Sequence, residues 1–448
     1  MKSLTRNISG WGRYPVQNCQ LFRPEKYQDL YPQSPTSIAY GNGRSYGDAA
    51  LNDQGAVILT GRLNRFIEFD RNTGILRAEA GVTLKEILDV IIPAGWFLPV
   101  TPGTQFATLG GCVAVDAHGK NHHHVGTFGK HVLSLELITS QNEKINCGPN
   151  QDSKIFWATV SGMGLTGLIG TVTLQLQPLS SVMMQVKNHA AANIEQAIQL
   201  LSDPSVDDQY SVAWIDCLAK DENLGRSIIM TAHHAHINEL SSEQRIAPFK
   251  LNPNKTKRLP FDLPHWVLNS SSVRLFNKHY YHHHAQLTTP YIQDYVSYFH
   301  PLDKILDWNR LYGKKGFVQY QCVIPTEHAL SGLQQLLDKL SHFGGASFLA
   351  VLKRFGESSQ GMLSFPIPGF TLALDIPMRD NATLQLLNEL DEIVLQYQGR
   401  IYLAKDARMS AATFRKMYPQ FEQWLTIKKM IDSKNTFSSS LARRLEIS

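Results

Sequence analysis

Five histidines occur within AVDAHGKNHHHVGTFGKH, residues 114–131 of this 448-residue chain. Imidazole is a common metal ligand, so a metal site is one explanation of this stretch. Three of the histidines are consecutive, however, and adjacent side chains of an extended segment point to opposite faces. They could not then all reach one ion, and packing or surface roles are the alternative. The five are His118, His122, His123, His124 and His131.

Three glycine-rich segments, residues 40–52, 99–121 and 161–170, could hold a phosphate-containing ligand. Glycine lets the backbone turn tightly, so that several N–H groups point into one concavity and bind an anion. The first segment lacks the third glycine of a Rossmann fingerprint and the lysine of a Walker loop. Taken alone it is either a structural turn or a phosphate nest. Three such segments, each flanked by strand-like runs, predict an extended cradle for a dinucleotide.

Polar side chains alternate along three strand-like runs in the second half of the chain. Residues 317–323 carry Gln319 and Gln321 on one face, and residues 370–375 carry Thr371, Ala373 and Asp375 on one face. In residues 347–355, Lys353 shares a face with Val351 and Leu349. If these strands are neighbours, the polar faces line one pocket. The alternative is a half-solvated sheet face.

The predicted order of strands and helices, which would position these groups, changes near residue 180. Before it, short strands such as 57–60 and 66–70 alternate with helical runs, and Thr83 with Glu86 has the spacing of a capping box. After it, a strand–helix–strand–strand order occurs twice, which predicts one antiparallel sheet with helices on one face. Residues 240–300, including HYYHHH at 279–284, read as an irregular and partly mobile loop.

Composition narrows the classes of protein. A hydrophobic content of 43% is ordinary for a globular chain, and 448 residues suggest two domains. The five cysteines form no CxxC pair, which predicts neither a disulfide framework nor a structural zinc site. No apolar stretch resembles a signal peptide or a membrane span, so we expect a cytoplasmic protein. The charge of +5 is mild, and no nucleic-acid-binding module is recognisable. Basic residues in 250–258 and 415–444 form either a solvated face or a surface that prefers phosphate or membranes.

Several motifs together resemble a known family. They are GNGRSYGD, HGKNHH, FWATVSGMGLTG, FVQYQCVIPTE, SFPIPGF, YLAKDAR and FSSSLARRLE. These resemble the FAD-linked oxidoreductases of the vanillyl-alcohol oxidase type and, more narrowly, the decaprenylphosphoryl-β-D-ribose oxidase family. The resemblance implies an α+β fold with an FAD-binding domain at 1–181, an antiparallel-sheet substrate domain at 182–400, and a C-terminal segment at 401–448 that completes the FAD region.

The resemblance also implies how FAD is held. Many relatives attach the flavin covalently through a histidine, and Arg44 stands at that position here, so we expect non-covalent FAD. Cys112 does not sit where relatives with a second tether place theirs, and we expect a small buried residue. His118 would lie beside the isoalloxazine ring. The cofactor-binding residues implied are Gly41, Asn42, Gly43, Arg44, Ser45, Tyr46, Gly47, Pro102, Gly103, Thr104, Thr108, Gly110, Gly111, Ala117, His118, Gly119, Asn121, Gly167 and Ile169.

On the substrate side the resemblance implies oxidation of a ring hydroxyl by hydride transfer to flavin N5. Lys405 would stabilise the developing alkoxide as a cation or take the hydroxyl proton as a neutral base. A surface ion pair with Asp406 is the alternative for Lys405. Relatives carry a cysteine where this chain has Ala373, and an asparagine where it has Thr371. The expected catalytic residues are Lys405, Gln321, Lys353, Tyr46 and His118, and the expected pocket residues are Gln319, Thr371 and Ala373.

The function expected from the resemblance is the oxidising half of an epimerisation of a polyprenylphosphoryl pentose or a related sugar. A short-chain reductase would be the partner, and the lipid-linked substrate would bring the protein to the membrane surface. An aldonolactone or alditol oxidase acting on a soluble sugar is the alternative. A non-catalytic flavin- or metal-binding protein is a further alternative from another class.

Overall fold

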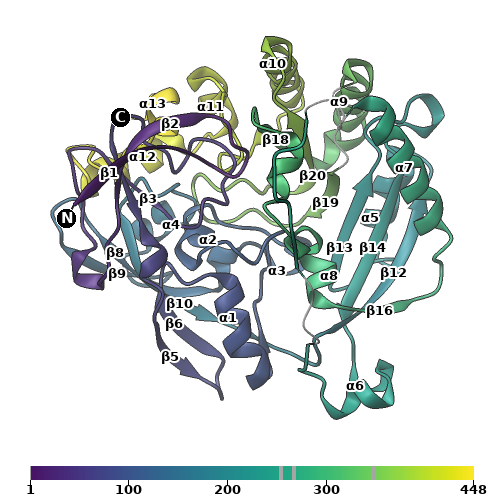
Figure 1. Cartoon of the computed structure of the whole chain (residues 1–448), viewed down its shortest axis with the longest axis horizontal. Coiled ribbons are helices and arrows are strands. Elements are labelled where there is room, and N and C mark those ends of the chain that lie inside the picture. The colour runs from purple at the N-terminus through teal and green to yellow at the C-terminus, as the bar shows by residue number, and fades with distance from the viewer. Residues whose placement is uncertain (1, 252–255, 265–268, 345–348, 448) are drawn as a thin grey trace.

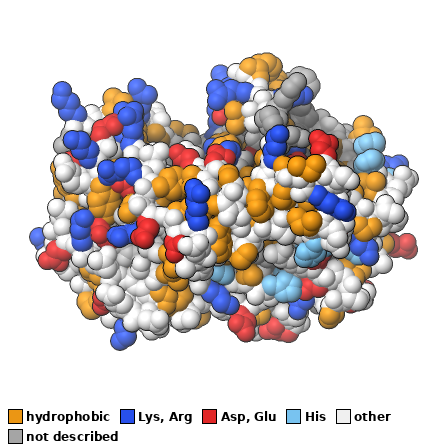
Figure 2. Space-filling model, turned by 90° about the horizontal axis from the view of Figure 1, so that it is seen from below, with side chains coloured by type: hydrophobic (Ala, Val, Ile, Leu, Met, Phe, Trp, Pro, Cys, Tyr) orange, Lys and Arg blue, Asp and Glu red, His pale blue; other side chains and the backbone are white. Residues whose placement is uncertain are grey.

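A computed structural model describes residues 2–251, 256–264, 269–344 and 349–447. Besides two sheets of two strands each, the described residues form two larger sheets in the N-terminal part and one large sheet in the middle part. The C-terminal helices return to the N-terminal part (Figure 1). Lys and Arg side chains are interspersed with Asp and Glu on the face seen in Figure 2.

The N-terminal part contains a four-stranded and a five-stranded sheet. The first has the order β1 (Ser3–Ser9), β2 (Val16–Phe22), β4 (Ala56–Leu59) and β3 (Ser37–Tyr40). The second has the order β5 (Phe66–Asp70), β6 (Ile75–Glu79), β10 (Leu168–Gln175), β8 (Val132–Ile138) and β9 (Lys144–Cys147). Helices α1 (Leu84–Ile91), α2 (Leu109–Ala114), α3 (His122–Val125) and α4 (Ser153–Thr159) accompany them.

The start of α1 follows the capping-box prediction. The Thr83 hydroxyl accepts a hydrogen bond from the Glu86 N–H, and the Glu86 carboxylate accepts one from the Thr83 N–H. The apolar positions of α1 are all buried, as their helical spacing predicts. A short 3-10 turn follows, and Gly95 ends it with a φ of 81°, a conformation that glycine adopts without strain.

The middle part of the chain forms one sheet of eight strands, as the repeated strand–helix–strand–strand pattern predicts. Its order is β16 (Tyr291–Asp294), β12 (Met183–Ala191), β14 (Ser227–His234), β13 (Tyr210–Ile215), β19 (Ala350–Phe355), β20 (Gly369–Pro377), β18 (Phe317–Pro325) and β21 (Arg400–Ile401). Every pairing within it is antiparallel. Helices α5 (Ile194–Ser202), α9 (Ala329–Phe343) and α10 (Asn381–Gln396) pack against it.

The prediction of an irregular segment at 240–300 was wrong for most of its described residues, and 252–255 and 265–268 lie outside the described ranges. The segment contains α6 (Ser242–Ile246), α7 (Ser270–Ala285), strand β16 and α8 (Tyr295–Phe299). HYYHHH lies within α7, which Asn269 caps by accepting hydrogen bonds from the N–H groups of Ser271 and Ser272. Its polar surface obscured the helical period, because the buried positions include Asn277 besides Val273.

The assumption that His122–His124 are extended was also wrong. They form the single turn α3, in which the Gly126 N–H donates to the His122 carbonyl at 3.0 Å. Gly126 then ends the turn with a φ of 78°. Neighbouring histidines therefore do not alternate between opposite faces, as they would in a strand.

The C-terminal segment returns to the N-terminal part. It contains α11 (Ala411–Met417), α12 (Phe421–Ile431) and α13 (Ser440–Arg444). The indole N–H of Trp424 donates to the Ala158 carbonyl at 2.8 Å, and Phe437 forms an isolated bridge with Ser37. Residues at opposite ends of the chain therefore lie side by side (Figure 1).

Candidate active site

The predicted cofactor loops contact one another. Gly41 faces Thr108, and a methyl group in its place would overlap the Thr108 hydroxyl. The Asn42 side chain donates to the Phe106 carbonyl at 2.9 Å. The Gly110 N–H donates a hydrogen bond to the Ala80 carbonyl at 2.8 Å. The loops at 41–47 and 102–111 therefore form one continuous wall.

The third glycine segment joins the same wall from the sheet. The Ala80 N–H donates to the Gly170 carbonyl at 2.9 Å. Gly167 lies against the Ile138 carbonyl of β8, where a side chain would not fit, and Ile169 is buried in β10. The close packing of Gly167 against β8 therefore explains by itself why this position is glycine.

Unpartnered polar atoms gather in these loops, as a site for a polar ligand requires. Buried polar atoms in proteins are nearly always hydrogen-bonded, so a group of exceptions calls for an explanation. A methyl group at Gly103 would meet only open space, which leaves room beside that loop. The residues present therefore fit FAD, a long polar cofactor. Within these loops, the buried side-chain atoms without a partner among the described residues are Arg44 Nε, Thr101 Oγ1, Gln105 Oε1, His118 Nδ1 and Asn121 Oδ1.

Arg44 lies between two aromatic rings, with its guanidinium carbon 4.0 Å from the centre of Trp11 and 5.1 Å from that of Phe106. Burial lowers its pKa from the usual value, although Asp303 opposes that effect. Asp303 comes from the middle part of the chain and accepts hydrogen bonds from Thr104 Oγ1 and the Gln105 N–H. These hydrogen bonds of Asp303 connect the wall to the middle part of the chain.

His118 is buried among aromatic rings after helix α2. The centre of its ring lies 4.9 Å from Phe355 and 5.3 Å from Tyr402. Its Nε2 is 3.0 Å from Gln321 Nε2, and burial, followed by the charge of Lys353, lowers its pKa well below the usual value. The imidazole is therefore neutral. Since an amide nitrogen only donates, Nε2 accepts and the proton is placed on Nδ1, which faces no protein acceptor.

The three polar strand faces meet, as the alternation predicts. Strand β20 lies between β18 and β19, with Gln321 and Val351 on either side of Ala373. Two residues from Ala373 along β20, Thr371 lies opposite Lys353 of β19. The Thr371 hydroxyl accepts a hydrogen bond from Gln321 Nε2 at 3.2 Å. Gln321 is therefore fixed between His118 and Thr371.

The other end of this face carries a buried carboxylate. Gln319 Nε2 donates to Asp375 Oδ1 at 2.6 Å, and Tyr312 OH donates to Asp375 Oδ2 at 3.3 Å. Burial raises the pKa of Asp375 to about 7. The alternation along β20 indicated the orientation of Asp375 but gave no reason to assign it a role. Tyr312 comes from a 3-10 turn that no sequence signal marked.

Lys405 approaches the same place from the segment after β21. Its Nζ lies 3.8 Å from the centre of the Tyr46 ring. Burial lowers the pKa of Lys405 to about 7, with Asp375 raising it and Lys353 lowering it further. Burial likewise lowers the pKa of Lys353 to about 8. The site thus holds two lysines that change charge near neutral pH.

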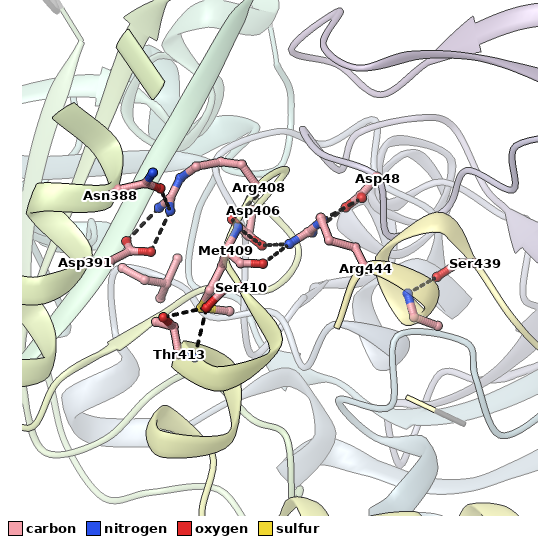
Figure 3. A network of polar contacts seen from close by, with 12 residues as sticks. Asp48, Asn388, Asp391, Asp406, Arg408, Met409, Ser410, Thr413, Ser439 and Arg444 are labelled. Atoms are coloured by element: carbon pink, nitrogen blue, oxygen red, sulfur yellow. Dashed lines mark hydrogen bonds and ion pairs between the residues drawn. The ribbon is translucent and has the colours of Figure 1, made fainter. Parts of the chain in front are cut away.

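A chain of buried ion pairs holds the segment that carries Lys405 (Figure 3). Arg444 lies between Asp48 and Asp406, at 2.7 and 2.8 Å. On the other side, Arg408 binds Asp391 of α10 through two hydrogen bonds of 2.6 Å. The Asp406 carboxylate is directed to Arg444, so the proposed surface pair between Lys405 and Asp406 is not what the geometry shows. No local sequence signal indicates this network.

Two family models match the chain. A model for an FAD binding domain matches residues 35–148, and one for D-arabinono-1,4-lactone oxidase matches residues 323–445. The chain is 38% identical to decaprenylphosphoryl-β-D-ribose oxidase of Mycolicibacterium smegmatis, over 99% of this chain and 98% of that protein. The chain belongs to the decaprenylphosphoryl-β-D-ribose oxidase family.

More distant relatives extend the same grouping. An uncharacterised Streptomyces coelicolor protein is 31% identical over 81% of this chain and 100% of its own length. An L-gulono-1,4-lactone dehydrogenase of Mycobacterium tuberculosis is 22% identical over 91% of this chain and 89% of its own. The chain is accordingly an FAD-dependent oxidoreductase of a family that includes lactone oxidases.

All five cysteines are buried free thiols, and burial raises the pKa of Cys112 to about 12. Cys112 is thus the small buried residue that we expected. Within the described ranges, no helix is long and apolar enough to cross a membrane.

Proposed function

We propose that this protein oxidises a ring hydroxyl of a polyprenylphosphoryl pentose, or of a related sugar, as the oxidising half of an epimerisation. The observation that carries the proposal is the convergence of Lys405, Gln321 and Lys353 beside His118, at the end of the cofactor wall. The name of the Mycolicibacterium smegmatis relative, similar along its whole length, supports the choice of sugar.

FAD, when bound, supplies the acceptor for the hydride at N5 of its isoalloxazine ring. Lys405 takes the proton of the substrate hydroxyl, because a pKa of about 7 leaves much of it neutral at physiological pH. The carboxylate of Asp375 then stabilises the ammonium that forms. Asp375 is itself held by Gln319 and by Tyr312.

The other polar groups orient the sugar. Gln321 is fixed by His118 and Thr371, so its carbonyl oxygen has a defined direction for a sugar hydroxyl. His118 offers an Nδ1–H that no described protein group accepts. Tyr46, Phe317 and Tyr312 stack or meet edge to face on the Lys405 side and exclude water there.

The product would be a keto sugar, which a separate enzyme must reduce to complete an epimerisation. We propose a short-chain reductase as that partner. We also propose that the protein meets its lipid-linked substrate at a membrane surface. Lys257 and Arg258 are exposed and lie close in sequence to Phe261, whose exposed fraction is 62%. Basic and apolar side chains of this kind suit an anionic lipid surface.

One observation favours a second candidate, oxidation of a soluble aldonolactone. The D-arabinono-1,4-lactone oxidase model matches residues 323–445, which include Lys353 and Lys405. Ala373 and Thr371 also give this pocket a shape that differs from that of relatives with cysteine and asparagine there.

An anaerobic visible spectrum of the purified protein separates these possibilities. Addition of polyprenylphosphoryl ribose should bleach the oxidised-flavin band, while D-arabinono-1,4-lactone should leave it. Bleaching by the lactone alone would favour the second candidate. A flavin band that no alcohol bleaches, with Lys405→Ala unchanged in every property, would favour a non-catalytic flavin protein.

A further inference from the structure

A second group of chemically capable side chains lies outside the flavin site. The Nε2 atoms of His123 and His124, in helix α3, face the carboxylate of Asp207. His123 Nε2 is 2.9 Å from Asp207 Oδ1, and His124 Nε2 is 3.1 Å from Asp207 Oδ2. Asp207 belongs to the loop between α5 and β13, so the group joins two segments that are 84 residues apart.

These separations suit a metal ion. Zinc binds imidazole nitrogen and carboxylate oxygen at about 2.0–2.2 Å, which places tetrahedral ligand atoms about 3.3 Å apart. The ligand atoms of the three residues all lie within 4.8 Å of one another, so small side-chain movements bring them to one ion. The objection that consecutive histidines cannot converge does not hold for this pair, because α3 is a helical turn.

The site is accessible to solvent on one side. The side chain of His123 is 4% exposed, whereas those of His124 and Asp207 are 45% and 21% exposed. Asp207 also borders a hollow of about 190 Å³, with His189 and Thr231 among its other lining residues. An ion can therefore enter, and positions not filled by protein can hold water.

A neighbouring group of histidines is a second candidate. His233, His236 and Glu239 also lie within 4.8 Å of one another. Nδ1 of His233 faces Asp208 at 2.8 Å and its Nε2 faces Glu239 at 3.1 Å, much as His123 and His124 face Asp207. We prefer the first group because Asp207 borders the hollow, whose lining includes none of His233, His236 and Glu239.

We propose that His123, His124 and Asp207 form a binding site for a divalent transition-metal ion such as Zn²⁺. The ion would brace α3 against the loop that carries Asp207. Helix α3 contacts β19, and the His122 Nδ1 accepts the Gly356 N–H at 3.2 Å just beyond that strand. A bound ion would therefore stiffen the region behind Lys353 and His118.

The proposal is tested by titrating untagged, FAD-loaded protein with Zn²⁺ in a calorimeter. We expect one Zn²⁺ per chain, with the affinity lowered at least about 10- to 100-fold in His124→Ala and in Asp207→Asn. Both side chains are partly exposed, so the variants should fold, and a retained flavin spectrum checks this. Zn²⁺ should also raise the melting temperature of the unaltered protein and not that of Asp207→Asn.

Two matched controls address rival histidines. His236→Ala removes a member of the neighbouring group, and His279→Ala removes one of two stacked histidines on α7, His279 and His283. Both should leave the Zn²⁺ affinity unchanged. Loss of binding in either control, unchanged binding in Asp207→Asn, or no binding below about 100 μM Zn²⁺ would overturn the proposal.

Discussion

Replacing Asp375 by Asn should shift the pH dependence of flavin reduction. The Asp375 carboxylate raises the pKa of Lys405, which burial otherwise lowers. The amide keeps the shape and can still bind Gln319 and Tyr312, but it carries no charge. The pKa of Lys405 should therefore fall, and the neutral base should persist to lower pH.

The size of the effect follows from the charge of one neighbour. A pKa of about 7 leaves about half of Lys405 neutral at pH 7, and Asp375, whose pKa is also about 7, is then about half ionised. Loss of a full opposite charge shifts a pKa by about one unit, so loss of this half charge shifts it by about half a unit and leaves about three quarters of Lys405 neutral. The rate at pH 7, relative to the rate at pH 9, should thus rise about 1.5-fold.

Stopped-flow measurement of flavin reduction at saturating substrate, from pH 5.5 to 9.5, gives this ratio directly. Asp338→Asn is the control, because that carboxylate is 63% exposed on α9 and should not alter the profile. An unchanged ratio in Asp375→Asn would refute the link between Asp375 and Lys405. A rate that falls as pH rises through 7 would refute the neutral-base role and favour a cationic Lys405.

Four further outcomes are expected. Lys405→Met should slow flavin reduction by about 10²- to 10⁴-fold while FAD stays bound, as measured by stopped flow and by the flavin spectrum. Arg444→Ala should lower the free energy of unfolding, measured by urea denaturation, by about 3–5 kcal/mol, because the buried carboxylates of Asp48 and Asp406 both lose their arginine partner. Arg415→Ala, which breaks an exposed ion pair, should lower it by only about 0–1 kcal/mol. Denaturation should release all FAD into the supernatant, and flavin that stays with the chain would contradict non-covalent binding. Mass spectrometry should find no adduct with nitroaromatic inhibitors, whereas Ala373→Cys should provide a thiol that forms one.

Sequence patterns that span only a few residues correctly predicted the features that depend on neighbouring residues alone. The alternation of side chains along β18 and β20 placed Gln321 and Ala373 on the same face, and the antiparallel register put them opposite one another. The capping box of α1 was likewise readable from two residues, Thr83 and Glu86. In each case the physical cause lies within a few residues of the chain.

The parts that sequence reasoning missed depend on distant packing. Helix α7 packs its few buried side chains on β12 and β14, and its histidine-rich surface gave no apolar stripe to reveal it. Tyr312 and Asp375 are 63 residues apart in the chain, and only the tertiary fold brings them together. The pair of Asp48 and Arg444 is separated by 396 residues, and nothing near either residue indicates the other.

That separation has a consequence for how the enzyme is made. Ribosomes add about 5–20 residues per second, so Arg444 follows Asp48 by about 20 to 80 s. During that time the nascent N-terminal loops lack both the arginine that neutralises Asp48 and the lysine that faces Tyr46. We therefore expect oxidation to begin only after Arg444 has left the ribosome. A prematurely terminated chain would retain many of the loops that we expect to contact FAD and still lack the groups that we expect to use it.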